Sequence, residues 1–128
     1  MNPQKISYDD FAKVEIKAGK ILSAEKIPDT DKLLKLSVDF GENQEISSIE
    51  EGKTVLVSKP RQIVSGISMY FPDPTVLIGK TCMFVTNLEP RMIKGYESNG
   101  MLFALSTNDG NFSLLEPNQT IPVGTKAK

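Results

Sequence analysis

TCMFVTNLEPRMIKGYESNGMLFALS, residues 81–106, combines two apolar runs with a polar, glycine-containing segment between them. It begins and ends with apolar runs, around Phe84 and around Leu102, that have the length and composition of β-strands. Residues 87–101 between the runs are rich in glycine and polar side chains, so we expect a long loop joining two strands. Short strands separated by turn residues recur along the chain, which predicts an all-β barrel.

Three other segments complete five principal strands. Residues 14–27 alternate until Ile21 and Leu22 break the pattern, so we expect a β-bulge near Gly19, and residues 33–40 place Lys35 on the polar side of an alternating strand. Residues 61–67 supply the remaining strand. This pattern fits a five-stranded OB-fold and also other small barrels.

Short helical turns and extensions surround the predicted strands. Ser7 has the character of a helix N-cap, and residues 76–78 before Gly79 predict a helical turn over one barrel end. Residues 42–58 interrupt the strand pattern, and β-rich residues 53–57 within them predict an extra hairpin. A C-terminal extension, residues 107–128, starts with a tight turn and carries more apolar side chains than one barrel can bury: Phe112, Leu114, Leu115, Ile121 and Val123.

The length of 128 residues suits a single domain, 1–128, with one hydrophobic core. The single cysteine, Cys82, excludes an intramolecular disulfide and lies in an apolar run, so we expect a buried thiol. No run approaches the roughly 20 apolar residues of a membrane helix, and the N-terminus lacks the apolar stretch of a secretory signal. We therefore expect a cytoplasmic protein.

The formal net charge of -1 argues at first against a nucleic-acid partner. Four acidic residues, however, fall within residues 42–51, which contain no Lys or Arg. Without those four side chains the formal charge would be +3. We expect the acidic segment to be a solvated loop and the remainder to be mildly basic.

The sequence argues against catalysis. It contains no histidine, the usual neutral-pH base and the commonest metal ligand. Ser65 and Ser98 have no recognisable activating base, and no phosphate-binding glycine loop occurs. We expect no catalytic residue, no metal and no cofactor.

Residues 87–101 instead suit contact with RNA. They combine the cations Arg91 and Lys94 with Tyr96 and two methionines, groups that can meet phosphates and flat bases. The simpler interpretation is a hairpin connection punctuated by glycines. Gly95 and Gly100 are expected to take positive φ or to allow a close approach of the backbone.

An ordered series of segments resembles the tRNA-binding domain family over nearly the whole chain. The series is DFAKVEIKAGKI (10–21), DKLLKLSVDFG (31–41), RQIVSGI (61–67), LIGK (77–80), NLEP (87–90) and SNGM (98–101). The family includes the C-terminal appendage of many methionyl-tRNA synthetases, free-standing dimeric tRNA-binding proteins and auxiliary factors of synthetase complexes. The resemblance implies a five-stranded OB-fold barrel with short helical turns and N- and C-terminal extensions. Residues 42–58 depart from the family pattern, which passes from the glycine to the next strand in a few residues.

The resemblance implies a non-catalytic, structure-specific tRNA-binding module, as the C-terminal domain or beta subunit of methionyl-tRNA synthetase or as a free-standing protein. The expected RNA-binding residues are Lys35, Arg61, Arg91 and Lys94 on phosphate, Asn87 and Ser98 as hydrogen-bonding groups, and Met101 against a base or ribose. An ion pair with a nearby glutamate is the alternative role for Arg61.

The expected partners are tRNA, a second copy of the chain and an aminoacyl-tRNA synthetase. We expect the homodimer to form through residues 107–128, and we expect no membrane contact. The alternative function is a chaperone-like, protein-binding dimer of the same family. Its binding surface would need exposed apolar groups, for which the candidates are Met69, Tyr70, Phe71 and Met92.

Overall fold

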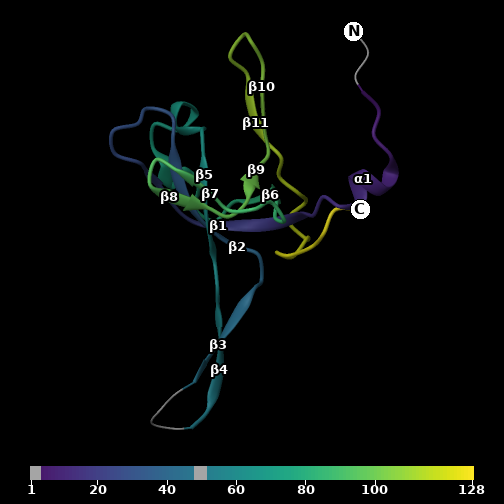
Figure 1. Cartoon of the computed structure of the whole chain (residues 1–128). Helices are drawn as coiled ribbons and strands as arrows, with labels where there is room; N and C mark the ends of the chain where they lie inside the picture. The colour runs from purple at the N-terminus through teal and green to yellow at the C-terminus, as the bar shows by residue number, and fades with distance from the viewer. Residues whose placement is uncertain (1–3, 48–51) are drawn as a thin grey trace.

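A five-stranded antiparallel sheet curls into a nearly closed barrel at the centre of the computed structural model (Figure 1), which describes residues 4–47 and 52–128. The strand order is β5-β2-β1-β6-β9. The outer strands approach each other where the Asn99 N–H donates to the Gln62 carbonyl over 2.8 Å. The bounds are β1 (Ile16–Lys26), β2 (Leu34–Asp39), β5 (Arg61–Ser65), β6 (Thr81–Val85) and β9 (Met101–Leu102). The all-β class and the five barrel strands are confirmed, and the architecture is that of an OB-like barrel.

The barrel interior is filled by the inward faces of these strands. In β2, buried and half-buried residues alternate strictly, as the sequence predicted. Cys82 is fully buried as expected, and burial raises the pKa of its thiol to about 11. The largest fully buried side chains are Phe84, Ile21, Leu34, Leu36, Ile63, Leu77, Val38 and Cys82.

The bulge in β1 is found near Gly19, as predicted. The pairing of β1 with β2 shifts register between Ile21 and Ser23, where Ile21 and Leu22 break the alternation of the sequence. Gly19 is needed for a different reason, since a Cβ there would lie 2.5 Å from the ring of Phe40. The glycine at this position therefore marks a close contact with Phe40.

The described part of the chain has three short helical segments beside the barrel: α1 (Tyr8–Ala12), η1 (Ser68–Tyr70) and η2 (Pro74–Leu77). Ser7 caps α1, because its Oγ accepts a hydrogen bond from the Asp10 N–H over 3.1 Å. Leu77 of η2 is fully buried and covers one end of the barrel. Both predicted helical turns are confirmed.

Residues 87–101 do not form the long loop that we expected. They contain a hairpin of β7 (Arg91–Ile93) and β8 (Tyr96–Ser98). Lys94 and Gly95 connect the strands with φ values of 52° and 86°, the left-handed pair that a two-residue type I′ turn requires. The alternative interpretation as a hairpin connection was therefore correct, and the predicted positive φ is found at both Gly95 and Gly100.

The inserted segment forms a second hairpin that projects from the barrel (Figure 1). Its strands are β3 (Asn43–Ser47) and β4 (Thr54–Ser58), and most of their side chains are exposed. This confirms the extra hairpin predicted from its composition. Glu50 and Glu51 of the acidic segment lie outside the described residues.

The predicted fifth strand, residues 101–106, is divided at Phe103. Its first part is β9, whereas β10 (Ala104–Ser106) leaves the barrel and pairs with β11 (Phe112–Leu114). Phe112 anchors this hairpin by stacking on Tyr70, with ring centroids 4.1 Å apart. Residues 104–114 therefore form a third projecting hairpin (Figure 1).

The chain then runs back along β1. The Gly124 N–H donates to the Ala18 carbonyl over 2.7 Å, and the Ala127 N–H donates to the Ile16 carbonyl over 2.8 Å. Part of the C-terminal extension thus covers its own barrel. Among the described helices, none has the length and apolar character to cross a bilayer.

Candidate nucleic-acid interface

Three of the predicted RNA-binding residues surround one small cavity, which we call the hairpin slot. Arg91, Ser98 and Met101 line this cavity of about 100 Å³, together with Val64 and Gly100. The slot lies between β5 and the β7–β8 hairpin. Arg91 and Met101 are exposed at its rim, whereas Ser98 is buried.

Ser98 holds the hairpin against the barrel. Its Oγ accepts a hydrogen bond from the Val64 N–H over 3.0 Å and donates to the Gly100 carbonyl over 3.2 Å. A buried hydroxyl with both kinds of partner is a fixed structural element. The role that the structure shows for Ser98 is therefore to position the slot.

Two further predicted cations lie near the hairpin slot. Lys35 pairs with Val64 across β2 and β5, and its Nζ lies 5.2 Å from the centre of the Tyr96 ring on β8. The same Nζ lies 3.4 Å from the carboxylate of Glu25. Lys94 is exposed in the hairpin turn. We call the β7–β8 hairpin together with the neighbouring Lys35 the hairpin surface. It carries three cations: Arg91 and Lys94 on the hairpin and Lys35 beside it.

Arg61 lies apart from this surface and is engaged within the protein. Its Nε and Nη2 donate to the two carboxylate oxygens of Glu42 over 2.7 Å each, and Nη1 donates to the Thr86 carbonyl over 2.6 Å. The Arg61 hydrogen bonds hold the pKa of Glu42 below its usual value. The structure thus contains the ion pair that was the alternative interpretation for Arg61.

Asn87 joins the end of β6 to the start of β1. Its Oδ1 accepts from the Glu15 N–H over 2.8 Å, and its Nδ2 donates to the Lys13 carbonyl. The neighbouring Thr86 hydroxyl donates to the Glu15 carboxylate and lowers the pKa of that group. Both hydrogen-bonding groups of the Asn87 side chain are therefore used to hold the N-terminal segment.

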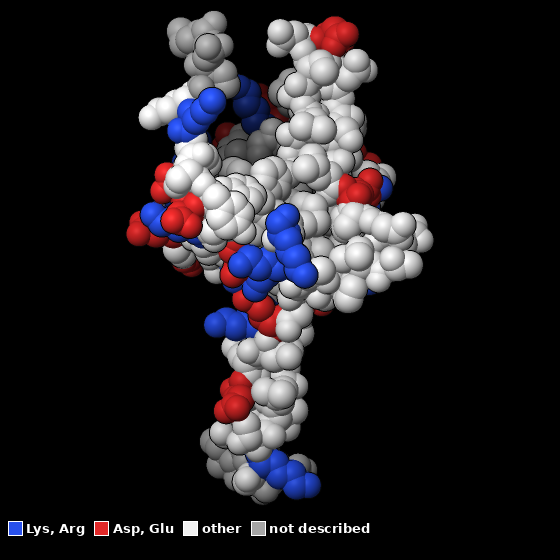
Figure 2. Space-filling model, turned by 90° about the vertical axis from the view of Figure 1, so that its right-hand side faces the viewer, with Lys and Arg blue, Asp and Glu red and all other residues white. Residues whose placement is uncertain are grey.

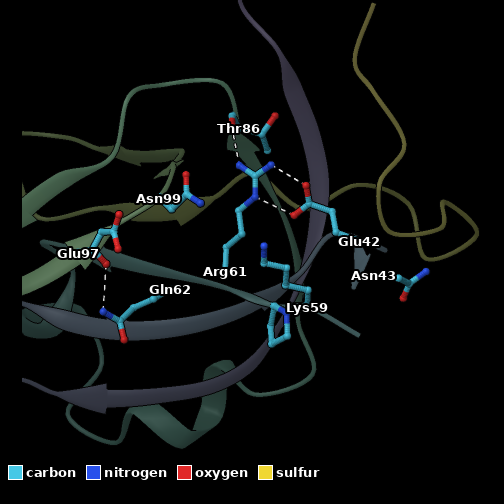
Figure 3. A pocket seen from close by; sticks show the side chains of 9 residues that line it. Glu42, Asn43, Lys59, Arg61, Gln62, Thr86, Glu97 and Asn99 are labelled. Atoms are coloured by element: carbon cyan, nitrogen blue, oxygen red, sulfur yellow. Dashed lines mark hydrogen bonds and ion pairs between the residues drawn. The ribbon is translucent and has the colours of Figure 1, made fainter. Parts of the chain in front are cut away.

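A larger hollow of about 630 Å³, which we call the root groove, lies where the β3–β4 hairpin joins the barrel (Figure 3). Arg61 and Glu42 form part of its wall. The remaining polar side chains around it were not predicted as site residues; they include Asn43, Lys59, Gln62, Glu97 and Asn99. Asn43 and Lys59 lie in or next to residues 42–58, which depart from the family pattern, whereas Gln62 and Asn99 lie within the segments RQIVSGI and SNGM that carry the resemblance.

The chemistry of both hollows is that of binding. They present cations, amides and a thioether, and the root groove combines two carboxylates with two cations. In the described part of the chain, no three His, Cys, Asp or Glu side chains are grouped so as to hold a metal ion. Such surfaces suit a ligand with phosphates and flat polar rings.

A small antiparallel barrel with cations beside a narrow slot defines a nucleic-acid-binding β-barrel. Residues 16–126 match the family described as "Putative tRNA binding domain", and the chain belongs to this family. It is a tRNA-binding module of the kind that the sequence predicted.

Curated relatives are methionine–tRNA ligases. The chain is 45% identical over 124 residues to the enzyme of Methanospirillum hungatei, which matches 97% of this chain and 16% of that protein. It is 35% identical over 121 residues to the enzyme of Enterococcus faecalis, covering 94% of this chain and 16% of the relative. The chain thus spans about a sixth of the length of the curated relatives that it matches.

Solved structures show the same fold. A protein related to methionyl-tRNA synthetase from Pyrococcus horikoshii has a TM-score of 0.79 and 36% identity, covering 98% of this chain and 100% of that one. The chaperone CsaA of Bacillus anthracis has a TM-score of 0.74 and 26% identity, again over 98% and 100% of the two chains. Both the synthetase-related and the chaperone-named branches are therefore similar to this chain.

Proposed function

We propose that this chain binds folded tRNA by its shape, through the hairpin surface, and supplies that tRNA to a synthetase. The observation that carries the proposal is the convergence of Arg91, Ser98 and Met101 on the hairpin slot, with Lys35 beside it. A few cations at fixed positions and one small cavity are enough to recognise the spacing of phosphates and one exposed base or ribose. The module performs no chemistry on the RNA.

The residues contribute in different ways to this proposal. Lys35, Arg91 and Lys94 contact phosphates, and Met101 packs against a base or ribose at the rim of the slot. Ser98 contributes by fixing the slot, because its hydroxyl is already engaged by Val64 and Gly100.

Arg61 and Asn87 stabilise the barrel junction. Their side-chain hydrogen bonds within the chain leave them few free groups. An RNA phosphate that reached Arg61 would use only the N–H groups that Glu42 and Thr86 do not occupy.

The setting follows from the relatives. Methionine–tRNA ligases match this chain over a sixth of their length, and a synthetase-related protein matches it over its full length. We propose that the module acts in the cytoplasm, either as the C-terminal domain or beta subunit of a methionyl-tRNA synthetase or as a free-standing protein. In each case binding raises the concentration of tRNA near the catalytic site.

We also propose that two copies form a dimer through their terminal segments. Figure 2 shows the face that bears both termini: the N-terminal segment and the β10–β11 hairpin project from it with a hollow between them. Ile6, Tyr8 and Leu105 are exposed on these segments. A self-complementary apolar surface of this kind closes as a two-fold dimer, which would give a composite surface wide enough for a folded tRNA.

A salt titration of tRNA affinity tests the phosphate contacts. If about four phosphates are neutralised, log K should fall with log salt at a slope near -3 to -4. Arg91→Ala should reduce the slope by about one, with similar losses for different tRNAs. Lys53→Ala is the matched control, because this lysine is exposed on the inserted hairpin, away from β7–β8. The proposed contacts would be refuted if log K for the wild type did not change with log salt, or if Arg91→Ala and Lys53→Ala changed the slope equally.

A chaperone-like, protein-binding dimer is the second candidate, favoured by the similarity to CsaA. Met69, Tyr70 and Met92 are exposed, whereas Phe71 is half-buried against the core. Tyr70 is also stacked on Phe112, so part of this apolar surface is used within the chain. Measuring tRNA and an unfolded polypeptide in one competition assay separates the two functions.

A further inference from the structure

The root groove differs from the hairpin slot in both its position and its chemistry. It is lined from one side by residues that join the inserted hairpin to the barrel, Glu42 and Lys59, and from the other by Gln62, Glu97 and Asn99. At about 630 Å³ it is much larger than the slot. A cavity of this size can accept a flat ring with an attached sugar phosphate.

The floor of the groove is fixed before any ligand arrives. Glu42 and Thr86 hold the Arg61 guanidinium by three hydrogen bonds, and the Gln62 side chain donates to the Glu97 carbonyl over 3.0 Å. Side chains held in this way lose little further entropy when a ligand binds.

Asn99 and Lys59 provide the free groups. Figure 3 shows the Asn99 amide and the Lys59 ammonium on either side of the Arg61 side chain, directed into the hollow. Within residues 4–47 and 52–128, the Asn99 side chain has no hydrogen-bond partner and Lys59 has no salt-bridge partner, although Asn99 is half-buried. The groove thus offers one amide that both donates and accepts, and one cation.

We infer that the root groove binds a single unpaired nucleotide of the RNA. The Asn99 amide would meet the edge of the base, and Lys59 would meet its phosphate. This inference rests on the proposed tRNA binding and adds a second contact site to it. Amide side chains bond bases through paired donors and acceptors, most often adenine, and unpaired bases are the part of an RNA that proteins read in this way.

The charge of the groove supports a nucleotide over a strongly anionic or cationic ligand. Glu42 is neutralised by Arg61 at 2.7 Å, which leaves the carboxylate of Glu97 to balance Lys59. A nearly neutral, amide-bearing groove has no excess charge to hold a free polyanion. It suits a neutral base whose single phosphate lies at the edge.

The inserted hairpin gains a role from this inference. Cross-strand pairing places Asn43 opposite Ser58 and Gln44 opposite Val57, so the two faces of the hairpin alternate. Asn43, on the face that carries more polar side chains, lines the groove, while the opposite face carries Ile46 and Val55. The hairpin therefore extends the groove with a polar wall that an RNA strand can follow.

The test uses a fluorescently labelled single-stranded adenylate hexamer and the full chain, with affinity measured by anisotropy. Asn99→Ala and Lys59→Ala should each weaken hexamer binding by about fivefold, the loss expected for one or two hydrogen bonds to a base or phosphate. Gln44→Ala is the matched amide control, because Gln44 is exposed on the opposite face of the inserted hairpin and does not line the groove. Lys53→Ala is the matched charge control on the same hairpin.

The outcomes separate this inference from the proposed function. Loss in the two groove variants with near-wild-type binding in both controls supports the inference. Absence of hexamer binding by the wild type, or equal behaviour of groove and control variants, overturns it. Arg91→Ala measured with intact tRNA tests the hairpin surface alone, so the groove can fail while tRNA binding survives. Thermal melting of each variant verifies that the barrel is intact, since the Asn99 and Lys59 backbone hydrogen bonds do not depend on their side chains.

Discussion

The identity of some residues in this barrel is fixed because the neighbouring side chains leave no room for a larger one. The Cβ that Gly19 lacks would lie 2.5 Å from the Phe40 ring and 2.7 Å from Val38. Phe40 in turn packs edge-on against Phe84, with ring centroids 5.2 Å apart. Gly19 is therefore a packing requirement of the interior and belongs to the barrel core.

We predict that Gly19→Ala destabilises the protein by about 1–3 kcal/mol, because the added methyl overfills a close-packed interior. Gly66→Ala is the control, since a Cβ at Gly66 would meet no atom within 4 Å and its φ lies outside the left-handed range. Denaturant unfolding of both variants provides the measurement. Equal stability of the two variants would show that the Phe40 ring moves aside at no cost.

The Arg61–Glu42 pair makes a pH-dependent contribution to stability. Its hydrogen bonds lower the pKa of Glu42 below the usual 4.5 in the folded state. The resulting stabilisation is fully present above pH 4.5 and is lost as the pH falls through the folded pKa.

Glu42→Gln should therefore be less stable than the wild type at pH 7, and the difference should shrink as the pH falls below 4.5. Glu15, whose pKa is lowered by Thr86, keeps some acid sensitivity in the variant. Urea unfolding at several pH values gives the comparison. A difference that stays constant from pH 7 to pH 3 would contradict the assigned role of the pair.

Residue roles were harder to predict than residue positions. The sequence marked Arg61, Asn87 and Ser98 as candidates and offered a glutamate ion pair for Arg61, but the local pattern did not identify which residues engage the three side chains. Those partners lie 19, 72 and 34 residues away for Glu42, Glu15 and Val64 respectively. Contacts at such separations depend on the closed barrel, which no local sequence signal encodes.

Among the elements, the β7–β8 hairpin determines the geometry of the hairpin slot. Its two-residue turn needs positive φ at both Lys94 and Gly95. A lysine at the first position is unusual, because asparagine or glycine takes this conformation more easily. Lys94 thus places a positive charge at the tip of the hairpin in a backbone conformation that asparagine or glycine would adopt with less strain.

We predict that Lys94→Asn preserves the turn but reduces the salt slope of tRNA binding by about one. Gly95→Ala should instead strain the turn without removing a charge, so it should lower the tRNA affinity while leaving the salt slope nearly unchanged. The two variants together separate charge from geometry in one titration series. The same change of slope in both would mean that the turn conformation is irrelevant to binding.

Elements were predicted where their signals are local. The alternation of residues 33–40, the cap at Ser7 and the extra hairpin of the insert were all indicated by neighbouring residues. The division of the fifth strand at Phe103 was not, because the apolar run continues from Met101 to Leu105. The stacking of Phe112 on Tyr70 holds β10–β11 outside the barrel, and nothing in that run indicates it.

On the scale of the whole molecule, the terminal segments only partly cover one another. Phe112 and Leu114 pack against the core, which accounts for two of the apolar residues that were expected to need a second surface. Tyr8 and Leu105 stay exposed, at 79% and 60%. The candidate dimer surface is therefore narrower than the whole extension of residues 107–128.

We predict a homodimer of about twice 14.1 kDa in sedimentation at micromolar concentration. The double variant Tyr8→Glu/Leu105→Glu should shift the protein to the monomer and reduce tRNA affinity, because a charge replaces an exposed apolar or aromatic side chain on each projection. Leu56→Glu, on the equally exposed inserted hairpin, is the control. A dimer that survives the double variant would place the interface outside the terminal segments.

The return of the chain along β1 brings its two ends to the same side of the barrel. Tyr8 and Phe11 of α1 border one hollow together with Lys126 and Lys128, while the β7–β8 hairpin lies on the other side of the molecule (Figure 1). A peptide fused to either end would therefore lie on the side of the barrel opposite the proposed RNA-binding hairpin. The barrel can thus be joined to another polypeptide at its head or its tail while the β7–β8 hairpin itself stays accessible.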